Sequence, residues 1–157
     1  MDSYPIEKQV CTLEQAKKLA ELLGENAPGS LWIWAIEVDI WGENPVYILN
    51  TESHIDDNPS NFPPEPMFKA YTAAELGALL PFYMDAEIKH GQFPIIVSYG
   101  IKIEHWNDIW TAKYEEREDV VFTECDSATE AHAKADLLIK LLKDKIIKPE
   151  DVSYDSN

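Results

Sequence analysis

The sequence predicts an α+β fold, with a mainly antiparallel sheet of about five strands and three helices packed on one of its faces. Three observations lead to this prediction. Three segments carry apolar residues at helical spacing behind a capping residue, the segments between them are rich in strand-forming residues, and the connections have hairpin length. A chain of 157 residues can bury the core of one domain, which we assign to residues 1–148, before an acidic tail at 149–157.

The first predicted helix covers residues 12–23. Thr12 and Gln15 form a capping box at its start, and Gly24 supplies a stop at its end. Its apolar residues recur at helical spacing and define a buried stripe: Leu13, Ala16, Leu19, Ala20 and Leu23.

Residues 31–41, L-W-I-W-A-I-E-V-D-I-W, are predicted to form a strand. The even positions, Trp32 and Trp34 among them, are all apolar and define a buried face. The odd positions begin apolar and turn polar, so we expect the first half to be covered on both faces and the second half on one. A turn at 42–45 leads into a partner strand at 46–49. We expect these two tryptophans to be buried together with Leu19, Leu138 and Leu142.

The middle of the chain contains a predicted loop and a short helix. Residues 50–66 contain four prolines and no apolar period, which is typical of a loop. A second capping box, Thr72 with Glu75, starts a helix at 73–80. Residues 82–92 stay open between helix and irregular structure.

Three strands and the longest helix complete the prediction. The strands are expected at 93–105, 110–116 and 120–124, joined by the turns W-N-D and E-E-R-E-D. Ser127 with Glu130 at the third position predicts a helix at 128–145, after which the tail is expected to fray. The buried stripe of this helix is Ala131, Ala135, Leu138, Ile139 and Leu142.

The charge of the chain excludes some partners. Thirteen basic residues face 29 acidic ones, for a formal net charge of −16. Such a polyanion is repelled by nucleic acids and by anionic membrane surfaces, so we expect it to bind neither directly. It could dock onto a protein with a basic surface, or the acidity could serve solubility alone. Apolar runs are too short to span a bilayer, no secretory signal is seen at the start, and two distant cysteines suit a reducing cytoplasm.

Three segments carry a resemblance. C-T-L-E-Q-A-K-K-L-A-E-L-L (11–23), Y-T-A-A-E-L-G-A-L-L-P (71–81) and A-T-E-A-H-A-K-A-D-L-L-I-K-L-L (128–142) occur here in this order. Together they resemble a group of small uncharacterised proteins of bacteriophages, prophages and other mobile elements, especially those of Bacteroides-type bacteria. The resemblance implies a shared fold, a mobile-element origin and a bacterial host cell. It assigns no catalytic residue and no cofactor.

Few residues suggest chemistry, and for each of them a structural interpretation competes. His54, Asp56 and Asp57 could ligate a metal, but three ligands in a proline-rich loop lack the support that a metal site needs, so we expect no tight binding. Cys125 and His132 could form a nucleophile–base pair, although cysteine is more often a small buried residue.

The paired carboxylates Glu37 and Asp39 share one strand face and are close enough for acid–base chemistry. The solvent-facing end of a strand gives the same pattern without any chemistry.

Aromatic residues beside turns suggest protein binding instead. Trp41 lies on the polar side of its strand, and Trp106 and Trp110 flank the N-D turn, where large rings rimmed by acids suit a contact patch. They could equally cap the end of the sheet. The expected partner-binding residues are Trp41, Glu37, Asp39, Trp106, Trp110, Glu115, Glu116, Glu118 and Asp119.

Two functional hypotheses follow. The first is a non-catalytic accessory protein of a mobile element, without a cofactor, which binds a basic protein surface through its acidic side chains. In one version it is a decoy that mimics nucleic acid. The second is a small enzyme or small-molecule-binding protein that uses the loop at 50–66, His54 and the nearby carboxylates. A pocket beside His54 would favour the second hypothesis.

Overall fold

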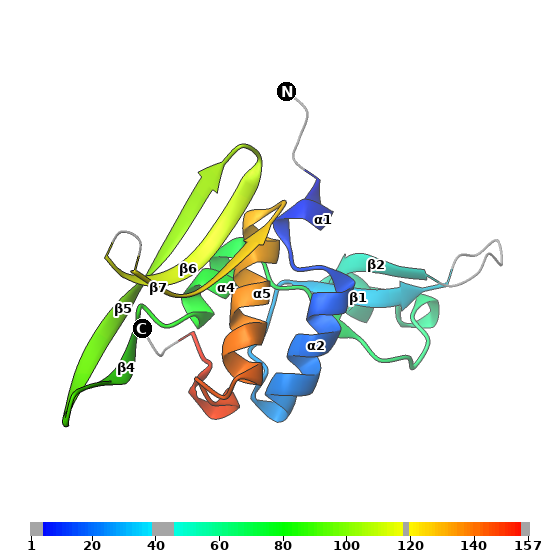
Figure 1. Ribbon diagram of the computed structural model, residues 1–157. Helices are drawn as coiled ribbons and strands as arrows, with labels where there is room; N and C mark the ends of the chain where they lie inside the picture. Colours follow the sequence, from blue (N-terminus) through cyan, green and yellow to red (C-terminus); the bar gives the residue numbers. More distant parts are fainter. Residues whose placement is uncertain (1–4, 39–45, 118–119, 155–157) are drawn as a thin grey trace.

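The computed structural model describes residues 5–38, 46–117 and 120–154 (Figure 1). Within these ranges the chain forms five α-helices, three short 3-10 helices and seven strands. The α-helices are α1 (Ile6–Gln9), α2 (Leu13–Leu23), α3 (Glu52–Asp57), α4 (Ala73–Leu79) and α5 (Glu130–Lys143). The strands are β1 (Trp32–Glu37), β2 (Val46–Thr51), β3 (Phe68–Lys69), β4 (Tyr83–His90), β5 (Phe93–Trp106), β6 (Ile109–Arg117) and β7 (Val120–Ser127). The 3-10 helices are η1 (Gly24–Asn26), η2 (Pro59–Asn61) and η3 (Pro149–Asp151).

The predicted α+β class with antiparallel strands is confirmed, but the strands form two sheets and not one of about five. The first sheet has the order β2-β1-β3 and the second the order β4-β5-β6-β7. Both edges of β1 are already paired, with β2 and with β3, so this strand cannot join the second sheet. Residues 82–92, left open by the sequence, contain β4, which pairs with β5 from Tyr83↔Gly100 to His90↔Phe93.

Helix α5 lies at the centre of the molecule. It packs against the four-stranded sheet, against α4 and against α2, and it stands between the sheet and α2 in Figure 1. Nine of its fourteen residues are buried, which exceeds the single stripe that the sequence predicts. The additional buried residues are Ala133, Lys134, Leu137 and Leu141. A helix buried this widely is enclosed from several sides.

Polar contacts tie α5 to its neighbours. The Gln15 side chain donates hydrogen bonds from Nε2 to the carbonyl of His132 (2.9 Å) and to Oδ1 of Asp136 (2.7 Å). Lys134 Nζ donates to the carbonyl of Ala73 (3.1 Å), which joins α4 to α5. Because these groups are buried or half-buried, unpaired partners would destabilise the fold.

Both predicted capping boxes are confirmed, at Thr12 with Gln15 and at Thr72 with Glu75. The cap predicted for the last helix is wrong. Thr129 is the N-cap of α5, and its hydroxyl accepts a hydrogen bond from the His132 backbone N–H. Ser127 cannot cap the helix because β7 continues through it, paired with Trp110.

The first strand reaches the main core less deeply than predicted. Leu19, Leu138 and Leu142 are buried there, but Trp34 is only half-buried against them, and Trp32 is half-buried at the start of β1. The opposite face of β1 is covered as well, in a second small core of Ile33, Ala35, Ile55 and Phe62. Coverage on both faces is therefore confirmed, and the full burial of both tryptophans is wrong.

The predicted loop at 50–66 is mostly structured. Strand β2 runs through Thr51, whose hydroxyl caps α3 by accepting from the His54 N–H, and η2 follows at Pro59. Ile55 and Phe62 of this segment pack under Ala35 of β1 and so fix the conformation of the segment. A sequence pattern within residues 50–66 cannot predict a contact with a residue so far away in the chain.

Residues 149–154, which belong to the tail that the sequence predicts to fray, pack against the body of the protein. Val152 is buried in the main core, and the Tyr154 hydroxyl donates to the carbonyl of Gly29 and to Oε2 of Glu75. Of the helices in the described ranges, none has the length and apolar character needed to cross a bilayer.

Leu138→Ala should lower the free energy of unfolding by about 3 kcal/mol, because it opens a cavity beneath the central helix. The matched control is Leu31→Ala, whose side chain is 64% exposed and whose loss should change stability by less than about 0.5 kcal/mol. Urea denaturation measures both. Equal losses in the two variants would contradict the central position of α5.

Candidate functional site

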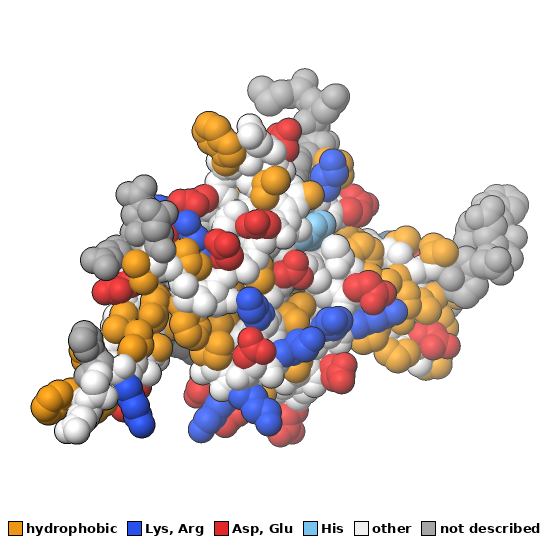
Figure 2. Space-filling model, in the orientation of Figure 1, with side chains coloured by type: hydrophobic (Ala, Val, Ile, Leu, Met, Phe, Trp, Pro, Cys, Tyr) orange, Lys and Arg blue, Asp and Glu red, His pale blue; other side chains and the backbone are white. Residues whose placement is uncertain are grey.

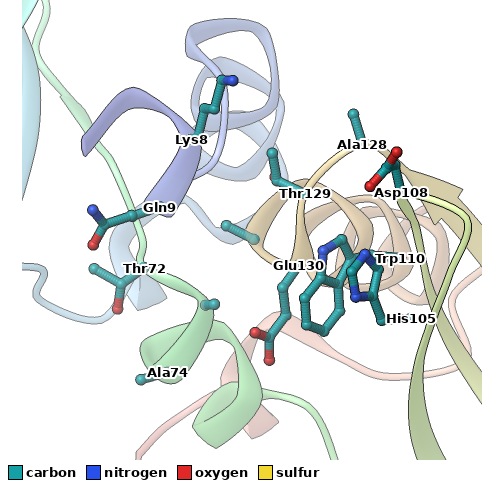
Figure 3. Close-up of a pocket in the computed structure, with 12 residues that line it drawn as sticks. Lys8, Gln9, Thr72, Ala74, His105, Asp108, Trp110, Ala128, Thr129 and Glu130 are labelled. Carbon is teal, nitrogen blue, oxygen red and sulfur yellow. The ribbon is translucent and has the colours of Figure 1, made fainter. Parts of the chain in front are cut away.

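A pocket of about 890 Å³ opens where α1 and the N-terminal ends of α4 and α5 meet the β5–β6 turn (Figure 3). Small residues such as Ala73, Ala74, Ala128 and Ala131 leave this space between the elements. The other lining residues are Lys8, Gln9, Thr72, His105, Asp108, Trp110, Thr129 and Glu130.

One wall of the pocket is a pair of stacked rings. The His105 and Trp110 rings lie 4.4 Å apart between centroids and 8° from parallel, from positions that face each other on β5 and β6. Trp110 is half-buried and packs against the main core, so only part of its ring is open to a partner.

Trp106, by contrast, is 78% exposed. Asn107 and Asp108 adopt positive φ angles of 49° and 61° in the tight turn between β5 and β6, a conformation that Asn and Asp tolerate well. Along β5, successive side chains alternate between the sheet's two faces, which separates Trp106 from His105.

The polar groups of the pocket are mostly engaged with the protein itself. Glu130 projects toward α4 in Figure 3, and its Oε1 lies 2.8 Å from Lys134 Nζ. The hydroxyls of Thr72 and Thr129 accept hydrogen bonds as helix caps. What the pocket offers is a ring surface over a floor of alanines, which suits a planar apolar group better than a charged one.

The metal-ligand candidates lie elsewhere, on α3. His54 Nε2 is 3.6 Å from Oε1 of Glu37, and the His54 ring packs edge-on against Phe62 with centroids 5.8 Å apart. Asp56 and Asp57 are on the same short helix. Within the described ranges, no group of three or more His, Cys, Asp and Glu side chains is placed to hold a metal ion. The pocket described above adjoins His105 and not His54.

The environment of Cys125 and His132 is unsuited to a nucleophile–base pair. Burial raises the pKa of the half-buried Cys125 thiol, whereas a reactive cysteine needs a lowered one. Burial also lowers the pKa of His132, whose Nε2 has no hydrogen-bond partner in the part of the chain that the structure describes. The structural interpretation of both residues fits these environments.

Glu115 belongs to a ring of four charges on the outer face of β5 and β6. Lys102 and Lys113 face each other directly, and both contact Glu104 and Glu115 at 3.0 to 3.2 Å. Hydrogen bonds to the two carboxylates raise the pKa of Lys102. The Glu115 charge is therefore compensated within the protein, which makes this residue a poor source of attraction for a basic partner.

The remaining candidates for partner binding are distributed over the molecule. Glu37 is at the end of β1, Trp106 is at the β5–β6 turn, and the exposed Glu116 is near the other end of β6. Asp39, Trp41, Glu118 and Asp119 lie outside the described residues.

Five acids lie on β1, on α3 and on the segment before β3, in the part of the molecule that carries the three-stranded sheet. We call this set the acidic end; it consists of Glu37, Glu52, Asp56, Asp57 and Glu65. All except Glu37 are exposed. The signal in the sequence is a charge imbalance, since residues 31–69 contain seven acidic residues and one lysine.

Comparison of the chain with family models, with curated proteins and with solved structures finds no match.

The buried Cys11 predicts a pH dependence of stability. Burial raises the pKa of its thiol from 9.0 to about 12, so the unfolded chain releases this proton at a lower pH than the folded chain. Stability should therefore fall by about 1.4 kcal/mol per pH unit from this group as the pH rises above about 9. Urea denaturation of the wild type and of Cys11→Ala between about pH 8.5 and pH 10 tests this, because Cys125 and the tyrosines, which also begin to titrate in this range, contribute to the slope of both chains. Cys11→Ala should remove this part of the slope, and an unchanged slope in that variant would contradict the assignment.

Proposed function

We propose that this protein acts by binding another protein that presents a basic surface, and that the acidic end is the contact site. The observation that carries the proposal is the presence of five carboxylates, four of them exposed, on β1, α3 and the segment before β3. The proposal includes the role of an accessory protein of a mobile element in a bacterial cell. That part rests on the resemblance of the three helical segments.

The carboxylates of the acidic end lack internal compensation. Within the described residues, Glu37 pairs with His54, and no lysine or arginine lies within ion-pair distance of the five acids. Lys69, the one basic residue in the sequence from 31 to 69, directs its Nζ to the carbonyl of Ala27 at 2.8 Å. Lys17 of α2 lies over the rings of Tyr47 and Phe68 in the three-stranded sheet. Acids that are not neutralised internally create a field that steers a cationic partner.

Apolar side chains accompany the acids. Val46, directly opposite Glu37 in the β1–β2 register, is 59% exposed, and Met67 is 43% exposed. An apolar patch with a polar rim is the usual anatomy of a protein–protein interface. The decoy version of the proposal, in which the acidic end occupies the nucleic-acid-binding surface of its partner, needs the same acids and apolar side chains.

A matched pair of triple variants tests the proposal. Glu52→Lys, Asp56→Lys and Asp57→Lys together should lower the association rate constant for a captured basic partner by at least about tenfold at low salt. The control is Glu14→Lys, Glu21→Lys and Glu25→Lys, three exposed positions on α2 and η1 with the same change in net charge.

The partner is isolated from bacterial lysate on the immobilised wild-type chain, and its kinetics are measured by surface plasmon resonance. The control variant should lower the association rate constant only to the extent that the net charge of the chain sets it. Equal effects of the two variants, or binding that does not respond to ionic strength, would contradict a contact at the acidic end.

The pocket beside Trp110 favours a second candidate function, the binding of a small molecule with a planar apolar group. This differs from the sequence-based alternative, which places the ligand near residues 50–66 and His54. A fragment that quenches Trp110 fluorescence, and whose binding is lost in Trp110→Leu but kept in Trp106→Leu, would favour this function.

A further inference from the structure

The hairpin of β4 and β5 projects from the body of the protein as an arm, which we define as residues 82–101. Figure 1 shows this arm extending away from the helices, and Figure 2 shows apolar side chains along the same region. Exposure rises along one face of β5, from 7% at Tyr99, beside the core, to 44% at Ile95 and 76% at Phe93. The core face of the sheet therefore continues past the point where α5 covers it.

The arm also has an open edge. In the order β4-β5-β6-β7, β4 is an edge strand, paired with β5 alone among the described strands. Edge strands template pairing with a further strand unless charges or bulges prevent it. The side chains that could prevent it are Asp85, Glu87 and Lys89, which share one face of β4.

The charge of the arm differs from that of the whole protein. Residues 82–101 contain two acids and one base, whereas the chain as a whole has a net charge of −16. Two copies of the chain would meet little repulsion at this arm, and its projection keeps the two acidic bodies apart. A basic partner, in contrast, would find little attraction here.

The sequence of β4 is complementary to itself. In antiparallel pairing of two copies, side chains on the same face must oppose each other, which limits the registers. A two-fold axis at Ile88 places each Glu87 opposite Lys89 of the other copy. Moving the axis to Ala86 places Asp85 opposite Glu87, and moving it to Glu87 places that residue opposite itself. The axis at Ile88 thus avoids direct like-charge pairs, which destabilise a sheet.

We propose that this protein forms a homodimer through antiparallel pairing of its two β4 edges about Ile88. On the face opposite the charges, the two Ile88 side chains meet across the axis, each with Ile95 of its own copy beside it on β5, so exposed apolar surface of Ile88 is removed from water. The two four-stranded sheets become one sheet of eight strands, with the acidic ends free for another partner. This inference concerns a different surface from the acidic end and does not depend on the proposed function.

Charge exchange across the two-fold axis provides the test. In Glu87→Lys the new lysines oppose Lys89, and in Lys89→Glu the new glutamates oppose Glu87, so each variant should raise the dimer dissociation constant at least about tenfold. Mixed together, the two variants restore both opposite-charge pairs and should form a heterodimer as stable as the wild-type homodimer. Glu124→Lys is the control, because it makes the same charge change as Glu87→Lys on the exposed face of the other edge strand, β7.

Sedimentation velocity over a dilution series measures the assembly state, and circular dichroism checks that each variant is folded. We expect a wild-type dimer, a Glu124→Lys dimer, two monomeric single variants and a dimer in their mixture. A wild-type chain that is monomeric throughout would overturn the proposal. It would do so even if the arm receives a strand from a different protein. Single variants that remain dimeric, or a mixture that remains monomeric, would also overturn it.

Discussion

The enclosure of α5 is the constraint on which the rest of this structure depends. Its apolar side chains are covered by the four-stranded sheet, by α2 and by α4. Its buried cation, the ammonium of Lys134, has polar partners within the fold. Lys134 is 8% exposed, and its ammonium lies between the Glu130 carboxylate and the Ala73 carbonyl. Gly77 gives it room, because a Cβ there would come within 3.0 Å of Nζ. The pocket beside Trp110 exists because α4 and α5 meet here through small residues.

A single central helix leaves parts of both sheets beyond its reach. The three-stranded sheet touches the main core through Trp34 and Phe68, and the small core around Ala35 stabilises its other face. The arm of the four-stranded sheet continues past the helix with its apolar face open. These two regions differ in charge, since one is rich in uncompensated acids and the other is close to neutral. Their different chemistry is the reason for proposing a basic partner at one and a second copy of the chain at the other.

Local signals in the sequence were sufficient for part of this architecture. The capping boxes at Thr12 and Thr72 start helices because their hydrogen bonds are made within four residues. Features that depend on distant contacts were not predicted. The order of residues 50–66 depends on packing under Ala35, the cap of α5 depends on how far β7 pairs with β6, and the division into two sheets depends on β3. For the candidate site, the role of Glu115 could not be anticipated, because its lysine partners are set by the β5–β6 register.

Native-state hydrogen exchange, followed residue by residue by NMR, tests the central position of α5 most directly. Amides buried at the centre of a cooperative core exchange only through global unfolding. Residues 134–142 should therefore be the slowest to exchange, with an opening free energy equal to that of unfolding by urea. The amides of β1 and β2 should open at a lower free energy, because their sheet depends on a smaller core. Exchange of α5 before β1 and β2 would contradict an architecture built around this helix.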